Sequence, residues 1–212
     1  MKKLLLFLLL FPLAVMAEFH PGTITMNDGS AKTGLIEVPA TAEKNKIRFK
    51  ADKDAQSEKF SIDDVKMFTV KFENDQAEVT YYALKLADLK TFKKEFKVAK
   101  RKSWVRMVKP GKVSIVAAYY YSPAIAGAVA STSTSGYNFY FWRPENDYGT
   151  FFYADLTSGI SVSVGAFKAL KKGVELNFNS DCPQLSGLLD KDDIKNNGLG
   201  RIVVLYEENC GK

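Results

Sequence analysis

The feature that most constrains the fold is a close succession of short runs in which apolar and polar residues alternate. GTITM and AKTGLIEV flank an Asp-Gly turn, and KIRFK, EKFSI, VKMFTVKF and AEVTYYALKL follow at short intervals. SWVRMV, KVSIVAAYYY, YNFYFW and GTFFYADL continue the series. Alternation with period two indicates strands, and an Asp-Gly pair between two such runs favours a hairpin. We therefore predict a mainly β (α+β) fold, whose antiparallel sheet curls into a sandwich or an open barrel.

The pattern becomes helical after Gly165, with apolar residues at positions 167, 170 and 174. Asp181 is a good N-cap, Pro183 suits a first helical turn, and Gln184 stands three residues after the aspartate. These signals predict a helix that begins at Asp181, runs through Leu189 and is ended by DKDDIKNNG.

LGRIVVLYEENCGK is expected to form the next helix, because Leu199, Ile202 and Tyr206 recur at helical spacing. The β-branched run from Ile202 to Val204 leaves a strand as the alternative. Two helices here would form a C-terminal antiparallel hairpin. The predicted organisation is therefore a signal peptide at 1–17, a β domain at 18–165 and a helical appendix at 166–212 that packs on the same domain.

The first seventeen residues, MKKLLLFLLLFPLAVMA, join two lysines to an uncharged apolar run and end on small residues, as a secretory signal does. The run from Leu4 to Ala17 has fourteen residues, and a membrane-spanning helix needs about twenty. We expect cleavage after Ala17, a secreted or periplasmic location and no transmembrane segment in the mature chain.

Two cysteines, Cys182 and Cys210, are the only ones in the chain. In the oxidising compartment that export implies, two lone cysteines are most simply one disulfide. The bridge would be structural, because a redox-active pair more often has two intervening residues and a lowered thiol pKa.

The two ends of the chain carry motifs that resemble those of a known group. The residues concerned are Asn27-Asp28-Gly29, Gly34 to Ile36, Ile47, Phe49, Ile62 to Val65, Asp181-Cys182-Pro183 and Ile202 to Cys210. Together they resemble uncharacterised small secreted β-rich proteins of the Bacteroidota type, which end in a DCP…YNxC-like tail. In this chain the tail from Tyr206 to Cys210 is longer by one residue. The resemblance implies a secreted, mostly β protein and brings no activity with it.

Residue types exclude several kinds of chemistry. His20 is the only histidine and follows the expected cleavage site closely, so serine–histidine and cysteine–histidine catalysis and multi-histidine zinc sites are not expected. No glycine-rich phosphate loop is present, and we assign no catalytic residue, metal or cofactor. Paired carboxylates remain an alternative, with Asp63, Asp64, Glu145 and Asp147 as candidates.

A basic segment runs from Lys85 to Lys112, with eleven lysines and arginines against two acidic residues, a net +9 in 28 residues. Its residues 88–100 suit either an amphipathic helix or a strand, and the pattern does not decide between them. The segment is either a solvated face that protects an edge strand or a surface for an anionic partner. On the second interpretation Lys93, Lys97 and Arg101 would contact the partner.

Aromatic residues gather in the triple tyrosine at 119–121 and in YNFYFWRP at 137–144. Alternation sends Tyr140 and Trp142 to one face of the second strand and Phe139 and Phe141 to the other, so either both faces are covered or one binds a partner. Tyr120, Tyr140, Trp142 and the neighbouring Arg143 are the candidate contacts.

Two functions follow. The first is a secreted or cell-envelope, non-enzymatic binding module, whose partner is an anionic envelope component, a glycan or a protein. The alternative is a carboxylate-dependent hydrolase acting on an envelope polymer or glycan. Nucleic acid is not expected as a partner, because removing Lys2 and Lys3 leaves 28 basic and 24 acidic residues, a net charge of only +4.

Overall fold

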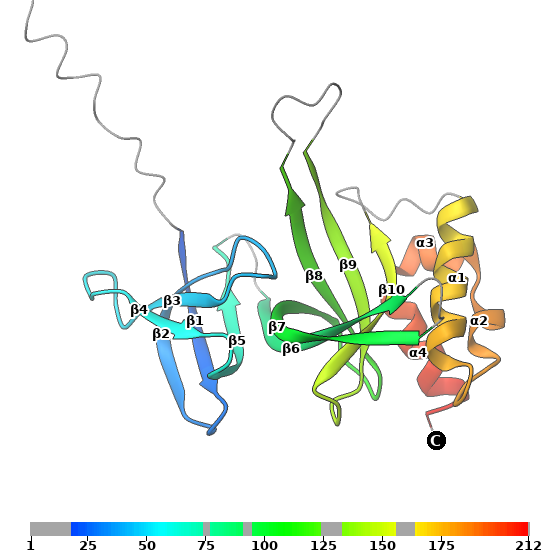
Figure 1. The fold of residues 1–212 in the computed structure, drawn as a ribbon, viewed down its shortest axis with the longest axis horizontal. Helices are drawn as coiled ribbons and strands as arrows, with labels where there is room; N and C mark the ends of the chain where they lie inside the picture. Colours follow the sequence, from blue (N-terminus) through cyan, green and yellow to red (C-terminus); the bar gives the residue numbers. More distant parts are fainter. Residues whose placement is uncertain (1–17, 74–76, 91–94, 124–132, 156–163, 212) are drawn as a thin grey trace, which may run out of the picture.

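A computed structural model describes residues 18–73, 77–90, 95–123, 133–155 and 164–211 (Figure 1). The expected signal peptide and Lys93 lie outside these residues. The strands are β1 (Phe19–Met26), β2 (Ala31–Glu37), β3 (Lys46–Lys50), β4 (Glu58–Ser61), β5 (Val65–Lys71), β6 (Glu78–Lys90), β7 (Glu95–Lys109), β8 (Ser114–Ser122), β9 (Thr134–Trp142) and β10 (Tyr148–Asp155). The helices are α1 (Val164–Phe178), α2 (Leu185–Leu188), α3 (Lys191–Asn197) and α4 (Gly200–Asn209). The mainly β class with a helical C-terminal segment is confirmed, and none of the described helices is long and apolar enough to cross a membrane.

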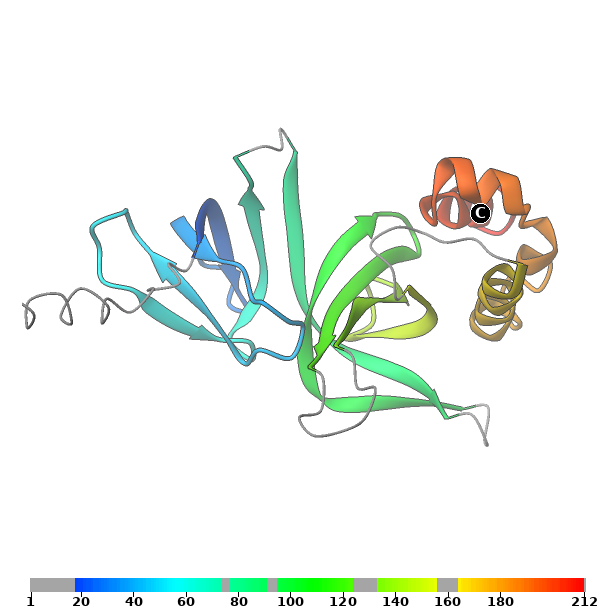
Figure 2. The same cartoon turned by 90° about the horizontal axis from the view of Figure 1, so that it is seen from above.

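The strands form one sheet in the order β10-β9-β8-β7-β6-β5-β1-β2-β3-β4. All neighbours in this order are antiparallel. A further parallel pairing sets Tyr148 to Thr150 of β10 against Lys85 to Ala87 of β6. This contact closes β6 to β10 into a five-stranded barrel, whereas β1 to β5 extend from it as an N-terminal unit. The N-terminal unit and the helices lie at opposite ends of the molecule, with the barrel between them (Figures 1 and 2).

The N-terminal unit has its own core, which contains Ile24, Ile36 and Phe68. This core also takes in Trp104 of β7, and Phe68 stacks on Tyr81 of β6 with ring centroids 4.8 Å apart. The two faces of β6 and β7 serve different cores: Ala83 and Trp104 belong to this core, whereas the adjacent Leu84 and Val105 belong to the core inside the barrel. The two strands therefore join the two β units.

Residues 38–45, here called the bridge loop, connect β2 to β3 and lie across β7 and β8. The Ala42 amide donates to the Tyr119 carbonyl at 2.9 Å, and the Trp104 amide donates to the Ala42 carbonyl at 2.8 Å. The Trp104 indole N–H donates to the Lys44 carbonyl at 2.8 Å. The bridge loop thus satisfies backbone groups just beyond Arg106 and Ala117, where β7 and β8 no longer pair.

The helices cover the outer face of β8, β9 and β10, so the rings of β9 are buried on both sides. Phe139 and Phe141 face the helices, whereas Tyr140 and Trp142 belong to the core inside the barrel. A Cβ atom at Gly173 would lie 1.9 Å from the Phe152 carbonyl oxygen, so α1 approaches β10 closely because this position has no side chain.

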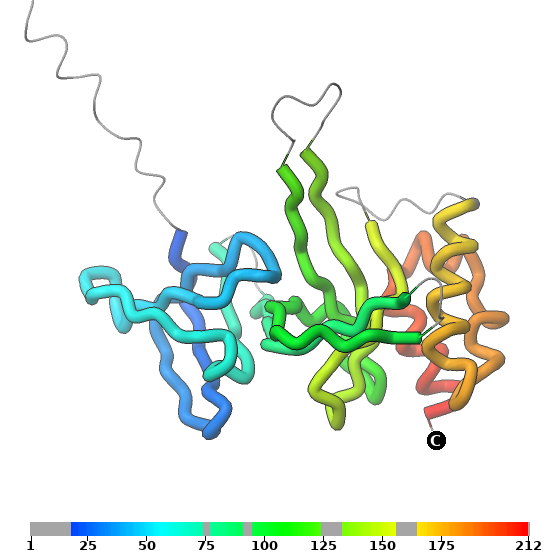
Figure 3. The backbone as a smooth tube through the Cα atoms, viewed as in Figure 1, coloured from blue at the N-terminus to red at the C-terminus, as the bar shows by residue number. Residues whose placement is uncertain are grey.

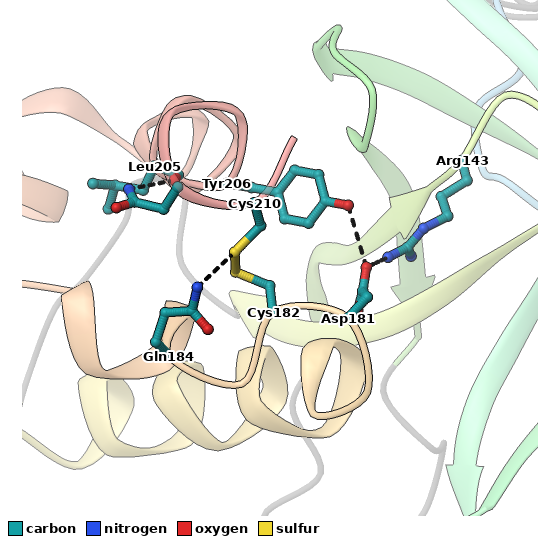
Figure 4. The surroundings of a disulfide bond; sticks show 8 residues. Arg143, Asp181, Cys182, Gln184, Leu205, Tyr206 and Cys210 are labelled. Carbon is teal, nitrogen blue, oxygen red and sulfur yellow. Dashed lines mark hydrogen bonds and ion pairs between the residues drawn. A yellow bond between two sulfur atoms is a disulfide. The ribbon is translucent and has the colours of Figure 1, made fainter. Parts of the chain in front are cut away.

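The predicted disulfide is confirmed and joins Cys182, just after α1, to Cys210, just after α4 (Figure 4). The Gln184 side chain donates to the sulfur of Cys210 at 3.0 Å. The bridge therefore joins the segment that follows α1 to the C-terminal end of α4.

The helix that was expected to begin at Asp181 is placed wrongly. The Asp181 carboxylate is an ion-pair partner of Arg143 and accepts a hydrogen bond from the Tyr206 hydroxyl, so Asp181 does not cap a helix. Helix α2 begins only at Leu185. The segment expected to break the helix instead forms α3, because Asp190 caps it by accepting from the amides of Asp192 and Asp193. The helix that follows is confirmed as α4, which excludes the strand alternative.

The undecided segment 88–100 is extended wherever it is described, from Asp88 to Lys90 in β6 and from Glu95 onward in β7. The pairing of Leu89 with Phe96 continues the ladder into a two-stranded ribbon. In the tube view the ribbon runs toward α1 (Figure 3).

Candidate binding groove

Two cavities lie along the boundary between the N-terminal unit and the barrel. The first has a volume of about 550 Å³, and its lining includes Lys66, Tyr82, Lys102, Trp142 and Pro144. The second has a volume of about 420 Å³, and its lining includes Lys46, Asp63, Arg101 and Lys102. Lys102 lines both, and the Asn27 side chain at the first cavity donates to the Asp63 carbonyl at the second. We call the two cavities together the junction groove.

Two aromatic rings line the first cavity. Tyr82 comes from the middle of β6 and Trp142 from the end of β9, and their ring centroids are 4.8 Å apart. The indole N–H of Trp142 donates to the Asn146 carbonyl at 2.9 Å, which fixes the ring at the turn between β9 and β10. Trp142 is 9% exposed, so only a small part of it can meet a ligand.

Positive charge accompanies these rings. Lys66 of β5 and Lys102 of β7 line the same cavity, and neither makes an ion pair within the described part of the chain. The carboxylate at this cavity, Asp147, is held by the Lys85 ammonium at 2.7 Å. The hydrogen bond from Lys85 lowers the pKa of Asp147 below its ordinary value. Lys102 also acts electrostatically on Asp147 without forming an ion pair with it, so the ammonium groups of Lys66 and Lys102 remain available beside the rings.

Arg101 reaches the second cavity because β7 carries a bulge. Lys85 of β6 pairs with Lys102 of β7, and Ala87 pairs with Val98. Between these two pairs β6 advances by two residues and β7 by four. The extra residues, which include Arg101, leave the regular ladder, and a bulge commonly redirects side chains in this way.

The structure thus brings together two of the predicted contacts, Arg101 and Trp142, in one groove. Lys97 is exposed on the ribbon, pairs in register with Asp88 and does not line either cavity. Tyr120 lies on the β8–β9 hairpin opposite Gly136, away from the groove.

The other two predicted contacts have structural partners. Tyr140 is 2% exposed inside the barrel, and its hydroxyl donates to Asp88 at 3.2 Å. Burial and the neighbouring Asp88 raise the pKa of Tyr140 above its ordinary value. Arg143 is an ion-pair partner of Asp181 (Figure 4), and its guanidinium lies 5.3 Å from the centroid of the Phe178 ring. Tyr140 and Arg143 therefore stabilise the interior and the helical layer.

The sequence did not single out Lys66, Tyr82 or Lys102. Lys102 belongs to the basic segment, but nothing local distinguishes it from its neighbours. Lys66 and Tyr82 lie in ordinary alternating strands, and only the pairing of β5 with β6 brings them near each other. No signal within a single strand could have identified them.

The candidate carboxylates are dispersed. Asp64 and Glu145 are exposed at turns, Asp147 is paired with Lys85, and Asp63 lines the second cavity together with Glu43. Both Asp63 and Glu43 are exposed, so they lack the desolvation that prepares a carboxyl group as a general acid. Among the described residues, no three histidine, cysteine, aspartate or glutamate side chains cluster closely enough to hold a metal ion.

No known protein family matches the chain, and neither curated proteins nor solved structures include a significant match.

Proposed function

We propose that the protein is a secreted or periplasmic, non-enzymatic binding module that holds an anionic partner in the junction groove. The Cys182–Cys210 disulfide supports the compartment, because such bonds persist in oxidising surroundings. The apolar N-terminal run preceded by lysines supports export. An acidic glycan of the cell envelope suits the groove best, because its rings and its charges would each find a matching group there.

The observation that carries the proposal is the position of Lys102, which lines both cavities and lies beside the ring pair of Tyr82 and Trp142. A lysine that makes no ion pair can neutralise an anionic group without first breaking one. The neighbouring rings offer an apolar surface for a sugar or an aliphatic chain. The first cavity, at about 550 Å³, is within the usual size range of ligand sites.

The test measures binding of the exported chain to soluble polygalacturonate at low salt. Replacing both Lys66 and Lys102 by glutamine should raise the dissociation constant about tenfold, which corresponds to about 1.4 kcal/mol for two charge-assisted contacts. The effect should shrink as salt is added, because exposed charges are screened.

The matched control is the pair Lys168→Gln and Lys195→Gln, which removes the same charge from exposed positions on α1 and α3. We expect this pair to change the dissociation constant less than about twofold. Equal weakening by both pairs would show that net charge alone drives binding and would contradict the groove. Polyglutamate is a second anionic polymer, without sugar rings. If the unmodified chain binds neither polygalacturonate nor polyglutamate, the proposal as a whole is contradicted.

A further measurement separates binding from hydrolysis. Release of reducing ends from polygalacturonate by the unmodified chain, lost in a Glu43→Gln, Asp63→Asn variant, would contradict a non-enzymatic module. We expect no such release, because both carboxylates are exposed to water.

A further inference from the structure

A smaller cleft, separate from the two cavities of the junction groove, opens on the opposite face of β6. Its volume is about 190 Å³. Tyr81 lines this cleft and Tyr82 lines the junction groove, in keeping with the alternation of side chains along a strand. The lining of the smaller cleft includes Tyr81, Arg106, Ala117, Tyr119 and Tyr137, and the bridge loop lies at its rim. We call it the tyrosine cleft.

The cleft exists because a small residue stands among large ones. Tyr81, Arg106 and Ala117 are directly opposite one another in register across β6, β7 and β8. Tyr119 and Tyr137 form the next pair along β8 and β9, with ring centroids 5.3 Å apart. The methyl group of Ala117 fills little of the space that these side chains enclose.

Arg106 is the charged group of the cleft. Its side chain is exposed and makes no ion pair within the part of the chain that the structure describes. Its neighbours in register are a tyrosine and an alanine, neither of which neutralises it. A guanidinium presents paired N–H donors that match the two oxygens of a carboxylate.

The remaining walls are aromatic and carry hydroxyl groups. Tyr81, Tyr119 and Tyr137 come from three different strands, and Trp104 closes one side. Burial raises the pKa of Tyr81, and the nearby Arg106 opposes the rise, so the two side chains interact electrostatically. Tyrosines offer both a ring face for stacking and a hydroxyl for hydrogen bonding.

We infer that the tyrosine cleft binds one small molecule that carries a single six-membered ring and a carboxylate, such as a hexuronic acid. The carboxylate lies on Arg106, and the ring lies over Ala117 between the tyrosines. The volume of about 190 Å³ is below that of typical drug-sized ligand sites, which limits the occupant to about one ring. This inference uses no residue of the junction groove and stands apart from the proposed function.

The test titrates the full exported chain with glucuronate and with benzoate, while nuclear magnetic resonance follows the signals of the tyrosines. Glucose and benzyl alcohol are the uncharged counterparts. We expect at least one of the two carboxylates to bind and its uncharged counterpart to bind at least tenfold more weakly. The better of the two carboxylates identifies the source as a sugar acid or an aromatic acid.

Two variants locate the site. Arg106→Gln removes the charge at an exposed position, and Ala117→Leu fills the space without removing any charge. Each should weaken binding at least tenfold, whereas the pair Lys168→Gln and Lys195→Gln, at exposed positions on α1 and α3, should leave it unchanged. If Ala117→Leu fails to fold, Arg106→Gln alone decides. Absence of binding by both carboxylates, equal binding of the uncharged counterparts or full binding by Arg106→Gln would overturn the inference.

Discussion

At the scale of single residues, two glycines in the helical layer occupy opposite environments and provide a matched pair. Gly173 of α1 lies against the backbone of Phe152, where a Cβ would be 1.9 Å from the carbonyl oxygen, whereas a Cβ at Gly187 of α2 would point into open space. Gly173→Ala should lower the free energy of unfolding by about 2 kcal/mol through overpacking. Gly187→Ala should raise it by up to about 1 kcal/mol, because alanine favours a helix. Urea unfolding measures both, and shifts in the same direction would contradict the packing of α1.

Residue-level patterns predicted which way side chains point but not what they meet. Alternation correctly separated Phe139 and Phe141 from Tyr140 and Trp142. Coverage of both faces depends on helices that begin more than twenty residues later, and no pattern within β9 contains that information. Gly173 likewise weakens the helix signal in the sequence, and its reason for being there is the contact with Phe152, a residue of another element.

At the scale of elements, the strands were the most predictable part, because period-two alternation and turn residues are local signals. The helical tail was harder. Asp181 and Asp190 both fit the sequence pattern of a helix N-cap, but only Asp190 caps a helix. Tertiary contacts make the difference, because Arg143 and Tyr206 bind the Asp181 carboxylate. The segment 88–100 suited a helix and a strand equally, and the pairing of its described residues, 88–90 and 95–100, decided for the strand there.

The disulfide should matter most for the helical layer, whose first and last helices it ties together. The cysteines are 28 positions apart, and closing a loop of this size stabilises the fold by about 3.5 kcal/mol on the chain-entropy model. Reduction should therefore lower the free energy of unfolding by about that amount in a urea titration. A Cys182→Ser, Cys210→Ser variant is the control, because its stability should not respond to reductant. An unchanged midpoint after verified reduction would contradict this role.

At the scale of the whole molecule, the sequence indicated a curled antiparallel sheet but not the contacts that complete it. The parallel pairing of β10 with β6 and the insertion of the bridge loop beside Trp104 both join segments far apart in the chain. The junction groove depends on these long-range contacts. Its lysines and rings come from β3, β5, β6, β7 and β9, so among the predicted partner contacts only Arg101 and Trp142 line it.

The buried tyrosines give the whole molecule a defined weakness at alkaline pH. Burial raises the pKa of Tyr81, Tyr140, Tyr153 and Tyr206 above the ordinary value of 10.0. A pKa that is raised in the folded state contributes stability that is fully present below the unfolded-state value and is lost as the pH rises through the folded-state value. The free energy of unfolding should therefore fall above about pH 10.

Tyr140→Phe isolates the largest part of this effect. The variant keeps the ring inside the barrel but loses the hydrogen bond to Asp88, which should cost about 1 kcal/mol at neutral pH. Above pH 10 its stability should decline less steeply than that of the unmodified chain, because one buried ionisation has been removed. Tyr121→Phe, at a 51% exposed position, is the control and should leave the slope unchanged. Urea unfolding at a series of pH values gives the slopes, and equal slopes for Tyr140→Phe and the unmodified chain would show that ionisation of this tyrosine does not limit alkaline stability.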